Sequence, residues 1–112
     1  MTIDPERVRS SQLYSTFSPH QKVLLWIYYL SKEEVRPVFL SELINLTGMS
    51  KPTVHRYVSE LEDFEYIRNS IVKIPKEKNA RGSKWGLKIE LANGETETYA
   101  KRLYQTVKEV FQ

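Results

Sequence analysis

The side chains of this sequence that are best suited to chemistry are basic, and they gather in one stretch. Between Tyr66 and Lys88, seven lysines and arginines stand against one acidic residue, although the whole chain of 112 residues has a formal net charge of only +3. Such a cluster suits a polyanion, because each phosphate that it contacts releases condensed counterions. A merely soluble surface usually mixes both signs. The stretch therefore indicates a nucleic-acid contact; the alternative is a lysine-rich hairpin that only keeps a sheet edge from pairing.

Other constellations that carry chemistry are missing from the sequence. It has no cysteine, and its two histidines, His20 and His55, lack the spacing of metal ligands. No glycine-rich phosphate loop and no set of nucleophile, base and orienting residue can be assembled from spacing. We therefore expect no enzyme, no cofactor, no metal and no small-molecule ligand. One acidic cluster is interpreted as the solvent end of a helix: Glu60, Glu62, Asp63 and Glu65.

A second group of polar side chains lies on one face of a helix predicted at about residues 50–63. Its buried face follows from apolar residues at i, i+3, i+4 and i+7. Arg56 on the opposite face could donate twice to a guanine in the major groove, because its guanidinium is a planar fork. Its neighbours suit phosphates or mixed roles, and the alternative is a solvated face without a partner. The buried residues are Val54, Tyr57, Val58 and Leu61, and the candidate DNA-binding residues are Ser50, Lys51, Thr53, His55, Arg56 and Ser59.

The basic stretch contains a predicted hairpin with a long cationic tip. Residues 67–74 and 85–91 are rich in β-formers, and the polar segment 75–84 connects them. Arg81, beside Gly82, is expected to enter the minor groove, where narrow A-tracts attract guanidinium groups. The lysines on either side would contact phosphates: Lys76, Lys78 and Lys84.

Further helices are expected to position these segments. Ser18 and Pro19 form a typical helix start, and a buried helix follows to about Ser31. A short extended piece over residues 36–40 precedes a second helix, which Ser41 is expected to cap and Gly48 to end. Residues 6–16 form either a short helix or an arm. Most aromatic side chains are expected in the core: Trp26, Tyr28, Tyr29, Phe39, Tyr57, Tyr66 and Trp85.

A last helix is expected from about Glu95 to Phe111. Its apolar stripe could pack on the helix that starts at Pro19, or it could pair with a second copy of the chain. The stripe reaches the penultimate residue, which favours a homodimer. The stripe consists of Tyr99, Leu103, Val107 and Val110 or Phe111, with Tyr104 adjacent.

This order of elements resembles the winged helix-turn-helix transcription regulators, most closely the MarR-like and IclR-like group that is also common in archaea and their mobile elements. The resemblance spans about residues 19–91, and many relatives have glycine where Phe64 and Glu65 stand. It implies an α+β fold: a three-helix core, a two-stranded β-hairpin wing and an additional C-terminal helix. The residues that carry it are 40–43, 47–50, 53–62 and 66–67.

Three parts of the chain follow from this interpretation. Residues 1–17 are an N-terminal arm or short helix, residues 18–91 the winged helix-turn-helix DNA-binding domain, and residues 92–112 a helix for dimerisation. No apolar run is long enough to span a bilayer and no signal peptide is evident, so we expect a cytoplasmic protein without a membrane contact.

The sequence thus predicts a sequence-specific double-stranded DNA-binding protein, a transcription regulator that represses by occluding a promoter. The helix at about 50–63 would read the major groove, and the wing at 75–84 would grip the backbone and the minor groove. Two alternatives remain open. One is a winged-helix module for protein interaction or assembly, and the other is a non-specific architectural binder of DNA or RNA.

Overall fold

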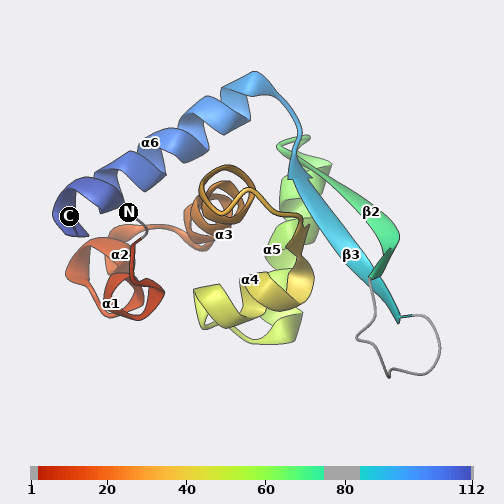
Figure 1. Cartoon of the computed structure of the whole chain (residues 1–112), viewed down its shortest axis with the longest axis horizontal. Helices are drawn as coiled ribbons and strands as arrows, with labels where there is room; N and C mark the ends of the chain where they lie inside the picture. Colours follow the sequence, from red (N-terminus) through yellow and green to blue (C-terminus); the bar gives the residue numbers. More distant parts are fainter. Residues whose placement is uncertain (1–2, 75–83, 112) are drawn as a thin grey trace.

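The computed structural model describes residues 3–74 and 84–111, and its elements follow the predicted order. They are α1 (Pro5–Arg9), α2 (Gln12–Thr16), α3 (Pro19–Tyr28), a π-helical turn η1 (Tyr29–Glu33), β1 (Val38–Phe39), α4 (Leu40–Thr47), α5 (Lys51–Asp63), β2 (Ile67–Ile74), β3 (Lys84–Leu91) and α6 (Gly94–Phe111). Figure 1 shows α3 in the middle, with α6 on one side and α4 on the other. The β2–β3 hairpin lies at one end of the molecule, and α1, α2 and both chain ends lie at the opposite end.

The central helix α3 is held at its start by a capping box and is buried along most of its length. Ser18 Oγ accepts a hydrogen bond from Gln21 N at 3.2 Å, while Gln21 Oε1 accepts one from Ser18 N at 2.8 Å. Pro19 occupies the first turn, where its missing N–H costs nothing. All residues from Val23 to Leu30 are buried, which confirms the predicted buried helix; η1 carries it to Glu33, slightly beyond the predicted end.

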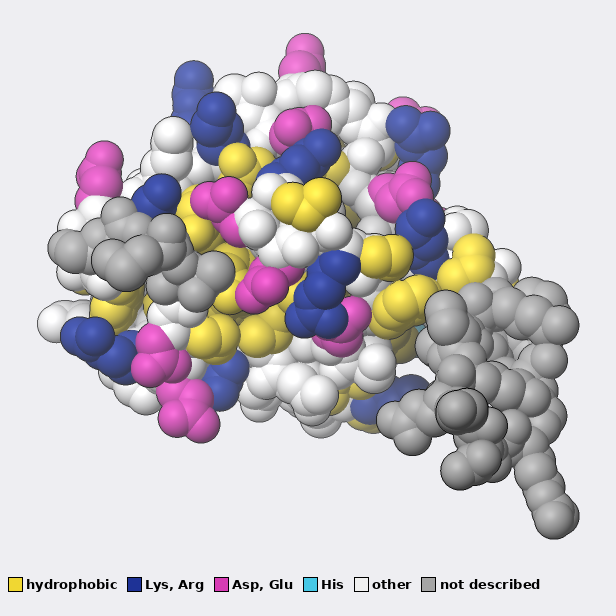
Figure 2. Space-filling view, in the orientation of Figure 1, with side chains coloured by type: hydrophobic (Ala, Val, Ile, Leu, Met, Phe, Trp, Pro, Cys, Tyr) yellow, Lys and Arg dark blue, Asp and Glu magenta, His cyan; other side chains and the backbone are white. Residues whose placement is uncertain are grey.

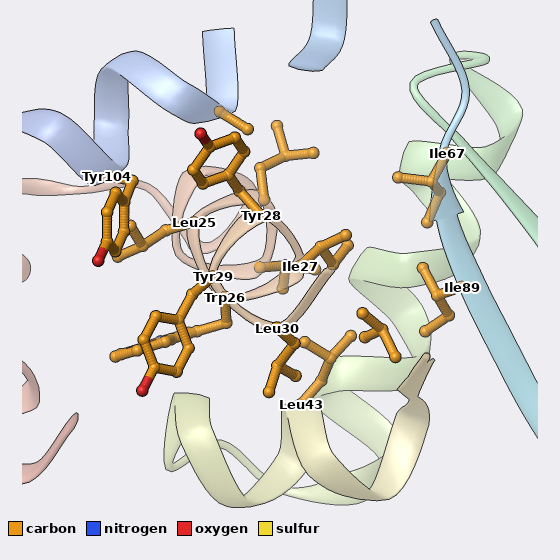
Figure 3. Close-up of a cluster of buried hydrophobic side chains, with 14 of the residues drawn as sticks. Leu25, Trp26, Ile27, Tyr28, Tyr29, Leu30, Leu43, Ile67, Ile89 and Tyr104 are labelled. Carbon is orange, nitrogen blue, oxygen red and sulfur yellow. The ribbon is translucent and has the colours of Figure 1, made fainter. Parts of the chain in front are cut away.

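One hydrophobic cluster joins α3 to the elements around it (Figure 3). Tyr28 and Tyr29 contact the ring of Tyr104 on α6, with centroids 5.5 and 6.1 Å apart. On the other side Leu30 points toward Leu43 of α4. Buried residues of α1 and α2 belong to the same cluster, so the N-terminal segment shares the core of the helix-turn-helix.

Residues 6–16, for which the sequence left two alternatives, form parts of two short helices. Ser11 caps α2 by accepting from Tyr14 N at 3.1 Å. The Tyr14 hydroxyl in turn accepts a buried hydrogen bond from Trp26 Nε1 at 3.0 Å. This bond ties the N-terminal helices to α3.

The start of α4 differs from the prediction. The helix begins at Leu40 with Phe39 as N-cap and without a side-chain capping bond, so Ser41 lies inside the first turn rather than at the cap. The physical reason is sheet pairing: β1 pairs with β3 through Val38↔Ile89 and Phe39↔Lys88, and this holds the chain extended up to Phe39. The predicted end is confirmed, since Gly48 has a φ of 73° in the left-handed region.

The buried face of α6 also differs from the predicted stripe. Packing of the whole stripe on α3, one of the two predicted alternatives, is wrong at Tyr99, which is 44% exposed. Of the alternatives Val110 and Phe111, Val110 is 59% exposed and Phe111 packs against the core. The sequence pattern misled because the buried face begins with a polar and a small residue. Thr96 can be buried there because its hydroxyl donates to Asn93 Oδ1 at 3.0 Å. The residues that face α3 and the core are Thr96, Ala100, Tyr104 and Val107.

The sheet is antiparallel, with strand order β1-β3-β2. The β2–β3 register runs from Ile67↔Leu91 to Ile74↔Lys84, which confirms the predicted hairpin and starts β3 one residue early. Tyr66 is 46% exposed rather than in the core, because it stands at the turn before β2. Within the described residues, no helix is long and apolar enough to cross a membrane.

Candidate nucleic-acid interface

The turn between α4 and α5 is tight, and side chains hold it from within. Thr47 Oγ1 donates to Leu43 O at 2.6 Å and accepts from Met49 N at 3.3 Å. Ser50 is the N-cap of α5, as predicted: its hydroxyl accepts from Thr53 N at 3.4 Å and donates to Thr53 Oγ1 at 2.8 Å. Three residues therefore connect the two helices, as in a helix-turn-helix.

A residue of α1 supports this turn from outside. Arg9 Nη1 donates to Leu46 O at 3.0 Å, which satisfies one of the carbonyls left unpaired at the end of α4. The stem of Arg9 also packs against Gly48, because Arg9 Cδ lies 3.5 Å from where a Cβ of that residue would stand. Sequence reasoning missed this role. Nothing in the local pattern signals a contact between residues 37 positions apart.

The face of α5 opposite the core carries the predicted side chains. Val54, Val58 and Leu61 are buried against α3, α4 and β2. Arg56 lies on the far side, with its side chain 69% exposed. Tyr57 is half-buried at the edge of the core. Of the other candidate residues on this helix and its cap, Ser50, Lys51 and His55 are exposed, and Thr53 and Ser59 are half-buried.

Arg56 makes loose contacts along its own helix. Its Nε lies 3.9 Å from Glu60 Oε1, and its guanidinium carbon stands 5.0 Å from the centre of the Tyr57 ring. Exposed ion pairs of this kind contribute at most about 1 kcal/mol. The guanidinium can therefore leave Glu60 for a stronger acceptor at small cost.

His20 and Glu60 form a pair beside this face that the sequence did not predict, since Glu60 was assigned to an acidic cluster at the solvent end of the helix. His20 Nε2 lies 2.8 Å from Glu60 Oε2, and the His20 ring stands edge-on to Tyr57 with centroids 4.9 Å apart. The pair joins the start of α3 to the middle of α5.

Acidic residues limit how much of α5 can approach a polyanion. Glu62 and Asp63 are exposed in its last turn, and Asp63 lies seven residues after Arg56 on the same side of the helix. Glu62 Oε2 accepts from Asn69 N at 3.2 Å and so ties the helix to β2. Phosphates would be repelled by this end. The N-terminal half of α5 is thus the part that suits a duplex.

The link between α5 and the hairpin contains backbone strain. Glu65 has a φ of 63°, in the left-handed region that favours glycine. The turn is closed by Tyr66 N donating to Leu61 O at 3.0 Å and Glu65 N donating to Glu62 O at 2.9 Å, the pattern of a Schellman cap. Asn93 Nδ2 also donates to Glu65 O at 3.3 Å. These three hydrogen bonds hold Glu65 in a backbone conformation that its Cβ disfavours.

The structure does not test the predicted wing contacts. Lys76, Lys78 and Arg81 lie outside the described residues, and Lys84 is placed by its backbone at the start of β3. At the base of the hairpin, Arg68 donates to Ala92 O at 2.6 Å and Lys88 pairs with Glu90 at 3.1 Å. Those two cations are thus engaged within the protein. On the face shown in Figure 2, basic and acidic side chains intermingle.

Comparison with known proteins identifies the helix-turn-helix. Residues 32–70 match the family described as the IclR helix-turn-helix domain, a range that includes β1, α4, α5 and the first half of β2. No curated protein matches the chain. The crystal structure of RV1404 from Mycobacterium tuberculosis is similar, with 18% identity and a TM-score of 0.46 over 95% of this chain and 62% of that one. The chain thus spans less than two thirds of the length of that structure.

The fold and the family match define a class of protein. The chain is a winged helix-turn-helix protein, which confirms the predicted fold class. Residues 32–70 are similar to the IclR helix-turn-helix domain, a DNA-binding domain of transcription regulators. The match supports a DNA-binding transcription regulator.

Proposed function

We propose that this protein is a sequence-specific double-stranded DNA-binding regulator that represses transcription by occluding a promoter. The observation that carries the proposal is the position of Arg56: exposed, in the first half of α5 and opposite the residues that bury the helix. A major groove about 12 Å wide accepts one α-helix, and residues near the helix N-terminus reach the base edges.

In the proposed complex, some side chains contact bases and others contact phosphates. Arg56 donates to the O6 and N7 atoms of a guanine, and His55 and Ser59 lie beside it. Ser50, Lys51 and Thr53 surround the N-terminus of α5, where backbone N–H groups and the helix dipole favour a phosphate. The wing would follow the adjacent backbone, with Lys76, Lys78 and Lys84 on phosphates and Arg81 in the minor groove.

Selection of duplexes from a random pool, followed by a salt titration of the winning sequence, tests this function. We expect a defined motif and an affinity that falls steeply with salt. Steep salt dependence without a motif would instead indicate an architectural binder of DNA or RNA. Neither a motif nor measurable affinity would indicate a protein-interaction module and overturn the proposal.

We also propose that the protein acts as a homodimer through the exposed side of α6. Val110, 59% exposed, and Tyr99, 44% exposed, are large apolar residues of α6 that the core leaves uncovered. A two-fold dimer requires a palindromic motif with half-sites about 34–36 Å apart or a multiple of that distance. Sedimentation of the wild type and of Val110→Glu tests this arrangement: a dimer that becomes monomeric supports it, and a wild-type monomer contradicts it.

A further inference from the structure

A hollow of about 690 Å³ opens between the start of α3, the end of α5, the turn before β2 and the start of α6. Its buried lining includes Leu24 and Leu61. Phe64, Tyr66 and Tyr99 also line it, and they are three of the six large apolar side chains that are exposed among the described residues. Half of that exposed apolar set thus gathers around one concavity, the arrangement typical of a ligand site.

The charges around the hollow have one sign. Glu65 and Glu95 line it, and none of its described lining residues is a lysine or an arginine. His20, which also lines it, is paired with Glu60 at 2.8 Å. The aromatic residues also favour a cation, because the faces of their rings attract positive charge. An anion would meet repulsion here, whereas an apolar cation would find both a counter-charge and rings to pack on.

We infer that this hollow binds an organic cation with an aromatic or aliphatic body, and that the cation changes the affinity of the protein for DNA. The volume lies within the range of about 300–1,000 Å³ that is usual for small-molecule sites. The second half of the inference rests on the proposed function, whereas the first half does not.

The position of the hollow explains the coupling. Glu65 lines it and is also the residue with a φ of 63° that connects α5 to the hairpin. A cation held by Glu65 and packed against Phe64 and Tyr66 contacts the turn that sets the wing relative to α5. A ligand shifts an equilibrium by its difference in affinity for the two states, and residues in sparsely populated backbone conformations cluster at ligand sites and switch regions.

Binding is tested on the full chain, without DNA, with two probes of nearly equal size and opposite charge: tetraphenylphosphonium and tetraphenylborate. We expect tetraphenylphosphonium to shift the backbone amide resonances of Leu61, Tyr66 and Thr96 in a saturable way, and tetraphenylborate not to shift them. Equal shifts by both ions, or shifts by the cation only elsewhere in the chain, would overturn the site.

Variants separate the site from non-specific attraction. Glu65→Gln with Glu95→Gln should weaken tetraphenylphosphonium binding about tenfold, and Tyr99→Ala should weaken it severalfold. Glu109→Gln, on an exposed part of the same helix away from the hollow, is the matched control and should leave binding unchanged. Glu95→Lys changes the charge of the two acidic lining positions from −2 to 0 and should strongly reduce the preference for tetraphenylphosphonium. An unchanged preference in this variant would contradict the site.

Coupling is tested separately, on the selected duplex. Tetraphenylphosphonium should change the Kd for DNA severalfold in the wild type but not in the Glu65→Gln, Glu95→Gln variant. Saturation of the hollow with no change in Kd would overturn the coupling alone. A failure of the DNA selection would overturn the proposed function but leave the binding result standing.

Discussion

The two long helices of the surface, α5 and α6, order their charges in opposite ways. In α6 the acidic residues Glu95 and Glu97 stand in the first turn and Lys108 in the last, as the helix dipole favours. In α5 no acidic residue stands in the first turn and no basic residue in the last. Instead Lys51 lies at its start and Asp63 at its end.

The difference indicates what each set of charges serves. Each charge at the unfavourable end of a helix costs about 0.3–1 kcal/mol. The arrangement in α6 stabilises the helix itself, whereas that in α5 works against its own helix. A phosphate at the N-terminus of α5 would reverse this balance, because both the cations and the dipole then act on an anion. We therefore attribute the cations of α5 to contact with an anionic partner.

The largest expected effect concerns the buried side of α5. Leu61→Ala removes a side chain that is 1% exposed in the hydrophobic cluster, so the free energy of unfolding should fall by about 2–5 kcal/mol. Chemical denaturation measures this loss. The matched change on the exposed side, Arg56→Ala, should alter it by less than about 0.5 kcal/mol. A large loss of stability from Arg56→Ala would contradict the division into two faces.

For DNA affinity, the exposed face of α5 is expected to matter more than the buried face. Arg56→Ala should weaken binding to the selected duplex by about 1–3 kcal/mol and relax the preference at one base position. Arg102→Ala removes the same charge from an exposed position of α6 and serves as the control. Titration at one fixed salt concentration compares them. Equal losses in both variants would show that net charge alone governs binding and would break the comparison.

The turn after α5 gives a smaller effect of opposite sign. Glu65→Gly relieves the left-handed strain at φ 63° and should stabilise the fold by up to about 1 kcal/mol, less the backbone entropy that glycine loses. Thermal or chemical denaturation detects the gain. Glu65→Gln, which keeps the Cβ, is the control and should show no such gain. Destabilisation by glycine would mean that the turn is not strained.

The buried side of α6 is expected to make stability depend on alkaline pH. Burial, together with the nearby Glu33 carboxylate, raises the pKa of Tyr104 to about 12. Its neutral form is therefore favoured in the fold, and stability should decline as the pH rises from about 10 to about 12. In Tyr104→Phe the decline measured by denaturation should be shallower. Some decline should remain, because burial also raises the pKa of Tyr14 and Tyr28.

How far the sequence predicted the molecule depended on the range of the interactions. The buried side of α5 followed from spacing, because Val54, Val58 and Leu61 are all apolar and all three are buried in the folded protein. The caps at Ser18 and Ser50 followed from local hydrogen bonding. Local signals of this kind survive folding because the atoms involved are within a few residues of one another.

The misses came from contacts that no local pattern records. The Arg9 bond to Leu46 and the His20 pair with Glu60 join residues 37 and 40 positions apart. Thr96 is buried in α6 because Asn93 satisfies its hydroxyl, which a search for apolar residues cannot detect. The hollow beside Glu65 likewise arises where four elements meet, so the sequence did not indicate a ligand site.

Inverting one charge at the start of α5 tests the central claim most directly. Lys51→Glu should stabilise the fold by about 0.5–1 kcal/mol, because a carboxylate is favoured at a helix N-terminus. It should also weaken DNA binding and reduce the dependence of log Kd on log salt concentration by about one unit or more. Lys101→Glu makes the same charge change on the exposed side of α6 and controls for net charge. The account predicts a gain in stability with a loss of affinity, larger than in the control. Affinity that matches the control, or a loss of both quantities, would contradict it.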